Sequence, residues 1–189
     1  MKRDVIYALL AALLFGASTP FAKLLLGDVA PVMLAGLLYL GSGVGLTLIR
    51  LIRDRGWKFP QLAITEWPWL LGAILFGGVL GPVTLLFGLT QTTGARASLL
   101  LNLEAVLTAV IAWTVFRESA DKRIVLGMAA IVLGGIALSW QTNVDASLNW
   151  LGPVLISLAC LCWAIDNNLT RKVSASDALF IAGVKGLIA

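Results

Sequence analysis

Residues 31–58 read PVMLAGLLYLGSGVGLTLIRLIRDRGWK, and they indicate the fold class of the chain more clearly than any other segment. Its first part, residues 31–52, is predominantly apolar and has the length of about 20 residues that a helix needs to cross the hydrocarbon layer of a bilayer. Four cations, Arg50, Arg53, Arg55 and Lys58, gather at its end. An apolar helix with cations at one end only is typical of a membrane span whose charged end lies in the cytoplasm.

Further stretches of the same character lie on both sides of this span. The chain is 59% hydrophobic and 13% charged, whereas soluble domains are about a quarter charged. The sequence therefore predicts an all-α, polytopic membrane helical bundle. The last stretch has only 12 residues and no polar stop, so we expect the chain to be truncated at its C-terminus. The predicted spans are residues 5–26, 31–52, 67–90, 94–116, 124–141, 151–169 and 178–189.

The cations lie on alternate connections between the spans. The connections at residues 27–30 and 142–150 have no Lys or Arg. This asymmetry predicts a multi-pass protein of the cytoplasmic (inner) membrane with its N-terminus in the cytoplasm. The basic connections hold Lys2 and Arg3, then Arg50, Arg53, Arg55 and Lys58, then Arg117, Lys122 and Arg123, then Arg171 and Lys172.

Several function classes are disfavoured by what the composition lacks. There is no histidine, which removes the usual metal ligand and the usual general base near neutral pH. Cys160 and Cys162 point to different faces of one helix, so neither a disulfide nor a metal site is expected. The net charge of +4 is spread over short loops and forms no nucleic-acid-binding stripe. We expect no enzyme, no metal, no cofactor and no nucleic-acid partner.

Glycine and proline predict how some spans bend and pack. Gly77-Gly78 and Gly81-Pro82 predict a kink in the third span, and Ser18-Thr19-Pro20 predicts a similar break in the first. The spacing Gly41–Gly45 allows close approach of another helix. We prefer packing within the chain to a homodimer as the explanation of that spacing.

Two segments indicate an internal repeat. Residues 15–23, FGASTPFAK, resemble residues 163–171, WAIDNNLTR, in having an aromatic residue, then polar or helix-breaking positions, then a cation at the same spacing. The two copies lie in the first and sixth spans and so cross in opposite directions, as in the inverted repeats of secondary transporters. We expect a complete five-helix repeat over residues 1–141 and the beginning of a second over residues 150–189.

Glu104 is the clearest ionisable group at membrane depth, and Thr108 lies one helical turn further on. Such groups are costly in a bilayer and usually serve a pathway or a partner. Glu104 is expected to carry a proton or attract a cation. The alternative is a structural ion pair with Lys23, Arg96 or Lys185.

Asp166 and Asn167, followed by Asn168, are further candidates for a solute or ion pathway. An acid and two amides in tandem predict a broken or water-lined segment. The alternative is that the span ends early and these residues begin a cytoplasmic loop. Lys23 is either a pathway residue or a side chain that extends to the lipid headgroups.

These motifs together resemble the EamA group of the drug/metabolite transporter superfamily. The resemblance rests on residues 15–23, on residues 97–105 (ASLLLNLEA) and on residues 116–118 (FRE). It implies a ten-helix bundle of two inverted five-helix repeats, and it points to Glu104 and to Glu118. Members often have proline after the intramembrane acid, where this chain has Ala105.

The function expected from the sequence is a secondary transporter in the lipid bilayer. It would move a small metabolite or drug-like solute by alternating access, with export as the expected direction and with proton or cation coupling. The alternative is a truncated, non-transporting remnant or a partner subunit of a membrane complex. The sequence does not indicate the solute or the coupling ion.

Overall fold

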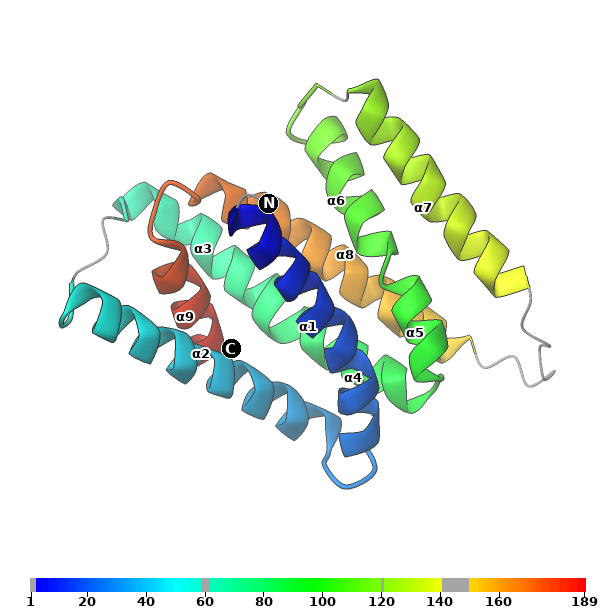
Figure 1. The fold of residues 1–189 in the computed structure, drawn as a ribbon, viewed down its shortest axis with the longest axis horizontal. Coiled ribbons are helices and arrows are strands. Elements are labelled where there is room, and N and C mark those ends of the chain that lie inside the picture. Colours follow the sequence, from blue (N-terminus) through cyan, green and yellow to red (C-terminus); the bar gives the residue numbers. More distant parts are fainter. Residues whose placement is uncertain (1–2, 59–61, 120, 141–149) are drawn as a thin grey trace.

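The computed structural model describes residues 3–58, 62–119, 121–140 and 150–189, and helices are the only regular elements in these ranges (Figure 1). One segment, η2, is a π-helix, and η1 is a short 3-10 helix. In chain order the elements are α1 (Arg3–Leu25), α2 (Pro31–Asp54), η1 (Ile64–Glu66), α3 (Trp67–Ala73), η2 (Ile74–Leu80), α4 (Gly81–Thr90), α5 (Gly94–Leu100), α6 (Leu103–Thr114), α7 (Lys122–Trp140), α8 (Leu151–Lys172) and α9 (Ala178–Ile188).

Among the described residues, five stretches of helix are long and apolar enough to cross a membrane, which confirms the polytopic helical bundle. The predicted span 124–141 is helix α7 up to Trp140, and its last residue lies outside the described residues. Helix α9 is apolar but has only 11 residues. The five stretches are Val5–Leu25, Pro31–Asp54, Ile64–Thr90, Gly94–Thr114 and Leu151–Lys172.

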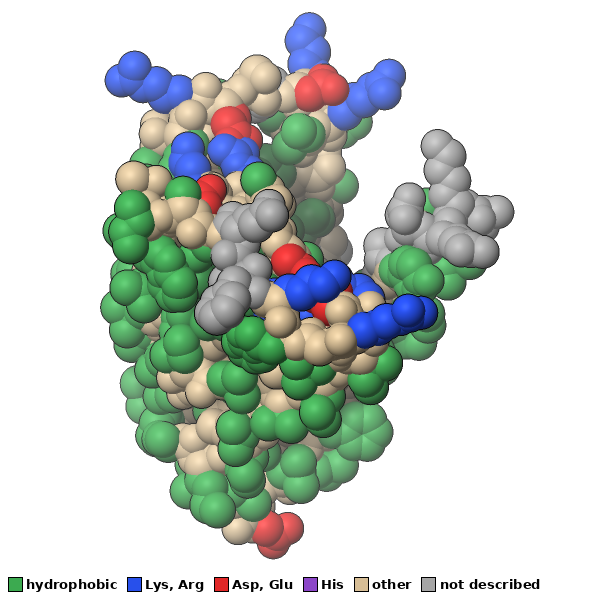
Figure 2. Space-filling model, turned by 90° about the vertical axis from the view of Figure 1, so that its left-hand side faces the viewer, with side chains coloured by type: hydrophobic (Ala, Val, Ile, Leu, Met, Phe, Trp, Pro, Cys, Tyr) green, Lys and Arg blue, Asp and Glu red, His purple; other side chains and the backbone are tan. Residues whose placement is uncertain are grey.

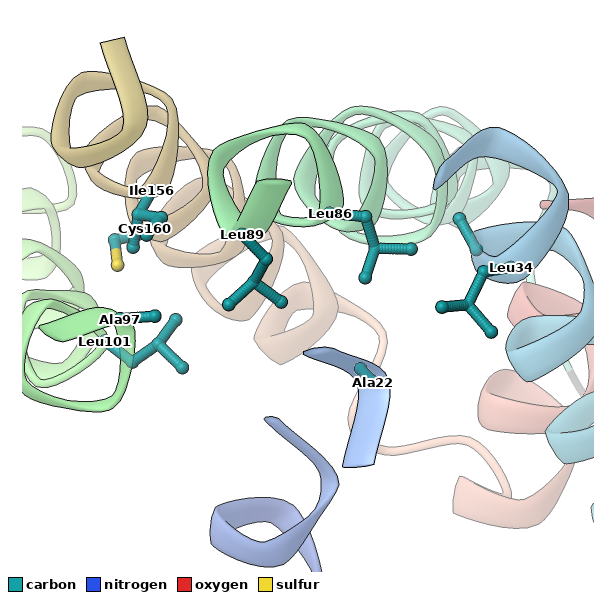
Figure 3. Close-up of a cluster of buried hydrophobic side chains, with 9 residues drawn as sticks. Ala22, Leu34, Leu86, Leu89, Ala97, Leu101, Ile156 and Cys160 are labelled. Atoms are coloured by element: carbon teal, nitrogen blue, oxygen red, sulfur yellow. The ribbon is translucent and has the colours of Figure 1, made fainter. Parts of the chain in front are cut away.

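Helix α8 occupies the middle of the bundle. It packs against α3, η2 and α4 on one side and against α5 and α6 on the other. One buried apolar cluster joins α8 to its neighbours, and Figure 3 shows its side chains lying between α8, α4, the end of α5 and parts of α1 and α2. The cluster consists of Ala22, Leu34, Ala35, Leu86, Leu89, Ala97, Leu101, Ile156 and Cys160.

Helices α2 and α9 lie side by side (Figure 1). A Cβ atom on Gly43 would lie 2.5 Å from the backbone of Gly186, so the two backbones meet where neither residue has a side chain. Gly41 and Gly45 form the predicted GxxxG spacing, with Gly43 between them. A Cβ atom on either of these two residues would lie in open space. The small residues of α2 thus pack within the chain, through the central glycine of the motif.

The third predicted span contains the expected irregularity, but its form differs from a simple proline kink. The π-helix η2 precedes Gly81-Pro82, and Pro82 lies in the first turn of α4. Leu80 is in the right-handed α region and the Gly81 N–H donates to the Phe76 carbonyl oxygen, so the helix passes from the π segment into α4 without a break at Pro82. Single-turn π segments of this kind are frequent at functional sites.

The fourth span has a feature that the sequence analysis does not predict. Within the stretch Gly94–Thr114, two turn residues, Leu101 and Asn102, separate α5 from α6. The Asn102 amide donates to the carbonyl oxygens of Ser98 (3.3 Å) and Leu99 (3.1 Å), which satisfies carbonyls at the end of α5. The predicted break at Ser18-Thr19-Pro20 is wrong, because α1 continues through these residues. A proline removes only its own hydrogen bond, and the rest of the helix is unaffected by that loss.

The charged side chains gather towards one end of the bundle. We call this the basic end; it holds Arg53, Glu118, Arg171 and Asp177, joined by ion pairs across the helices. Figure 2 shows Lys and Arg side chains in the upper half and centre of one face, with hydrophobic side chains covering the lower part. This distribution matches the alternation of basic and uncharged connections in the sequence.

Candidate functional site

Asn167 of α8 meets the polar face of α6. Its side-chain amide donates to Glu104 Oε1 at 2.9 Å and to the Thr108 hydroxyl oxygen at 3.3 Å. Glu104 lies ten residues from each end of the span Gly94–Thr114, in the first turn of α6. Three predicted pathway residues from two distant parts of the chain therefore come together at membrane depth.

Asn168, the next residue of α8, fastens the same helix pair. It is only 3% exposed, and its amide donates to the Thr108 carbonyl oxygen (3.1 Å) and to the Ala164 carbonyl oxygen (2.8 Å). Helix α8 runs without interruption from Leu151 to Lys172. The segment 166–168 is therefore neither broken nor the start of a loop, because its side chains find partners on α8 itself and on neighbouring helices. A water-lined segment stays a prediction.

A cavity of about 590 Å³ opens between α8, α6 and the turn that precedes α6. Small side chains on α6 leave space for it, and Glu104 contributes a carboxyl group to its wall. Among the described residues no cation lies within ion-pair distance of that carboxyl group. The lining residues are Leu101, Asn102, Glu104, Ala105, Thr108, Ala109, Ala112, Glu118, Asn167, Asn168 and Arg171.

Asp166 faces a different set of partners. It is 6% exposed, and the Lys185 ammonium group on α9 donates to both of its carboxylate oxygens, at 2.5 and 2.6 Å. The Thr170 hydroxyl group donates to Asp166 Oδ1 at 2.8 Å. A buried carboxylate is tolerated when a cation and hydrogen bonds compensate it, and Asp166 has both.

Gly77 in the π-helix makes room for this ion pair. A Cβ atom at Gly77 would overlap the carboxylate of Asp166, so only glycine fits there. The Gly77 carbonyl oxygen accepts hydrogen bonds from the Tyr39 hydroxyl group (2.6 Å) and the Trp163 indole N–H (3.1 Å). The irregular backbone of η2 is thus stabilised by side chains from α2 and α8.

A second cavity, of about 430 Å³, lies between α2, α8 and α9. Its polar lining residues are Tyr39, Ser42, Thr170, Ser174, Ser176 and Lys185. The Asp166–Lys185 pair therefore lies next to this space, whereas Glu104 and Asn167 belong to the first cavity.

Ion pairs join the helices at the basic end. Arg171 of α8 pairs with Glu118, and the Phe116 ring lies beside the cations of Arg171 and Lys172. Arg53 of α2 pairs with Asp177, whose carboxylate also caps the first turn of α9. The hydrogen bond from Arg53 lowers the pKa of Asp177 below its usual value.

The structure separates the predicted site residues into groups. Glu104, Thr108 and Asn167 line the first cavity. Glu118 and Arg171 line the same cavity where it meets the basic end of the bundle. Asp166 belongs to the buried pair with Lys185. Lys23 lies apart from both, and its ammonium group donates to the Leu89 carbonyl oxygen in the last turn of α4.

Sequence reasoning missed Tyr39, Thr170 and the partnership of Lys185. The tandem glycines at 77–78 were the available signal, because a backbone without side chains admits a bulky or charged neighbour. The identity of that neighbour depends on how α8 and α9 pack against η2. The local sequence around residues 77–78 does not determine this packing.

Comparison with known proteins agrees with the resemblance seen in the sequence. The profile of the EamA-like transporter family matches residues 2–140. An uncharacterized transporter of Methanothermobacter thermautotrophicus is 28% identical over 94% of this chain and 56% of its own length. The uncharacterized transporter YyaM of Bacillus subtilis is 27% identical over 91% of this chain and 57% of its own length.

A second Bacillus subtilis relative, the uncharacterized transporter YetK, is 27% identical over 68% of this chain and 38% of its own length. The chain thus spans about half the length of the curated relatives it matches. No solved structure matches it.

The family profile covers most of the chain, including the Glu104 segment and residues 116–118. The helical membrane architecture fits that match, and the chain belongs to the EamA-like transporter family.

Proposed function

We propose that this chain forms part of a secondary transporter that moves a small metabolite or drug-like solute across the cytoplasmic membrane by alternating access, in the export direction. The observation that carries the proposal is the cavity in which Asn167 of α8 meets Glu104 of α6. Polar groups at membrane depth are costly, and those that line a space usually belong to a substrate or ion pathway. The cavity volume lies within the range of small-molecule sites.

Contacts between corresponding parts of the two repeats support an inverted-repeat architecture over residues 1–141 and 150–189. Helices α2 and α9 are the second helices of their repeats, and they pack against each other in opposite directions. Phe15 and Trp163, the aromatic residues that open the two similar motifs, meet edge to face with ring centroids 6.2 Å apart. Equivalent residues meet in this way close to a two-fold axis in the membrane plane.

The basic end supplies contacts that alternating access would break and remake. Arg171–Glu118 joins α8 to the end of α6, and Arg53–Asp177 joins α2 to α9. We assign this end to the cytoplasm, together with the N-terminus, because cations favour that side. Opening of the first cavity towards the cytoplasm requires separation of the Arg171–Glu118 pair, since both residues line it.

Glu104 is the group to which we assign ion or solute coupling. It lies in the cavity wall and accepts one hydrogen bond from Asn167. Asp166 is less suited to this role, because Lys185 already compensates its charge. A carboxyl group that alternates between a proton or cation and the solute would couple the two movements.

Flux measurements in proteoliposomes test the proposal. The 189-residue chain is reconstituted, and flux of a panel of amino acids, amines, sugars and organic acids is compared with protein-free vesicles. Glu104→Gln removes the charge at nearly constant volume and is expected to abolish flux. Asp28→Asn, which removes one negative charge from an exposed loop, is expected to leave flux unchanged.

Equal flux in wild type and Glu104→Gln would remove Glu104 from the mechanism. Absence of flux from a chain that is folded and inserted would favour the second candidate, a partner subunit of a membrane complex.

A further inference from the structure

The amide donors of the first cavity are already occupied. A side-chain NH₂ group has two hydrogens, and the nitrogen of each of the three asparagines in the wall has two acceptor oxygens within hydrogen-bond distance. Asn102 donates to the carbonyl oxygens of Ser98 and Leu99. Asn167 donates to Glu104 and Thr108, and Asn168 donates to the carbonyl oxygens of Thr108 and Ala164.

These partners also fix which way each amide points. Asn102 and Asn168 each face two backbone carbonyl oxygens, which accept hydrogen bonds but cannot donate them. A flipped amide would place its oxygen against another oxygen. The amide oxygens of Asn102, Asn167 and Asn168 are therefore the groups left over, and none of them has a donor among the residues that the structure describes.

The charge of the cavity wall has the same character. Glu104, Glu118 and Arg171 are its charged lining residues. Arg171 pairs with Glu118 at the basic end, which leaves the charge of Glu104 uncompensated by any described cation. The wall thus combines one carboxylate with amide oxygens, and its Thr108 hydroxyl group accepts a hydrogen bond from Asn167.

We propose that this cavity binds the protonated amine of a small organic cation, with the ammonium group at Glu104 and the carbon skeleton along the alanine face. The inference deepens the proposed function and rests on it for the identity of the cavity as a solute site. An ammonium group has donors only, which complements a wall rich in acceptors. Ala105, Ala109 and Ala112 supply the small apolar face. A carboxylate or phosphate solute would meet acceptors and a like charge, which is destabilising.

Equilibrium binding with three matched probes tests this charge selectivity. The full 189-residue chain in lipid nanodiscs is titrated with n-butylammonium, n-butanol and n-butyrate by isothermal titration calorimetry at neutral pH. These probes share a carbon chain and differ in the charge and donors of the head group. Butylammonium is expected to bind at least about tenfold more tightly than the other two, as expected for a charge-assisted hydrogen bond.

Variants locate the site. Glu104→Gln is expected to remove the preference for butylammonium, Glu104→Asp to retain it, and Asp28→Asn to bind like wild type. Equal binding of the three probes by wild type would overturn the proposal even if Glu104→Gln failed to fold. Undiminished butylammonium binding by a folded Glu104→Gln protein would overturn it as well.

Binding and flux fail independently. Flux of an anion or a neutral solute that requires Glu104, without butylammonium binding, would refute the cation site and leave the transporter proposal standing. Charge-selective binding without flux of any solute would support the cation site and contradict the transporter proposal.

Discussion

Two carboxyl groups at membrane depth have different partners although the sequence presents them similarly. Asp166 is buried and receives hydrogen bonds from Lys185 and Thr170. Glu104 lies in a cavity wall and receives one from Asn167. The compensated group is suited to holding helices together, and the uncompensated group is suited to binding a cation or a proton.

The Asp166–Lys185 pair should therefore be a stability determinant. Lys185→Met leaves a buried carboxylate without its cation and is expected to lower the free energy of unfolding by about 3–5 kcal/mol. The double variant Lys185→Met/Asp166→Asn removes both charges and should recover much of that loss. Unfolding in a denaturing detergent titration measures the four members of the cycle. With Asp166→Asn as the second single variant, a double variant whose loss equals the sum of the two single losses would show that the pair contributes no coupling.

Sequence reasoning at this scale identified residues but not pairs. Glu104, Thr108 and Asn167 stood out because polar side chains at membrane depth are rare, and the structure brings them together. The sequence offers Lys185 only as an alternative partner of Glu104, whereas the structure pairs it with Asp166. Their meeting depends on Gly77, whose missing side chain leaves the space that the carboxylate occupies.

Interruptions of the helices were harder to predict than the helices themselves. Pro20 suggested a break where α1 is continuous, whereas the break between α5 and α6 coincides with Asn102. Proline disrupts one hydrogen bond at a known position. Asparagine competes for several backbone carbonyls only when the local geometry permits it. The composition of a span therefore predicts its existence better than its continuity.

The contact between α2 and α9 offers a matched test of close helix packing. Gly43→Ala would place a methyl group 2.5 Å from the Gly186 backbone, and this overpacking is expected to cost about 1–3 kcal/mol of unfolding free energy. Gly45→Ala lies in the same helix with open space around it, and higher helix propensity should make it neutral or slightly stabilising. Equal effects of the two substitutions, measured by detergent-induced unfolding, would contradict the packing assigned to Gly43.

At the scale of the whole molecule, α8 and α9 are held by the helices that precede them. Helix α8 packs between the third and fourth spans, and α9 packs along α2. The fold class and the alternating charge followed from composition and spacing, because bilayer thickness and cation placement constrain any span. The position of α8 in the middle did not follow, since several packing orders satisfy the same hydropathy pattern. The boundary expected between the repeats, at residues 142–149, lies outside the described residues.

Whether the cavity between α6 and α8 belongs to a solute pathway can be tested through its accessibility to water. Ala105→Cys places a thiol in its wall, in a background with Cys160→Ala and Cys162→Ala. Leu126→Cys on the apolar surface of α7 is the control. A membrane-impermeant thiol reagent, applied to right-side-out and inside-out vesicles in turn, should label Ala105→Cys from both sides and leave Leu126→Cys unlabelled. An Ala105→Cys thiol as inert as the control from both sides would contradict a solute pathway at this place.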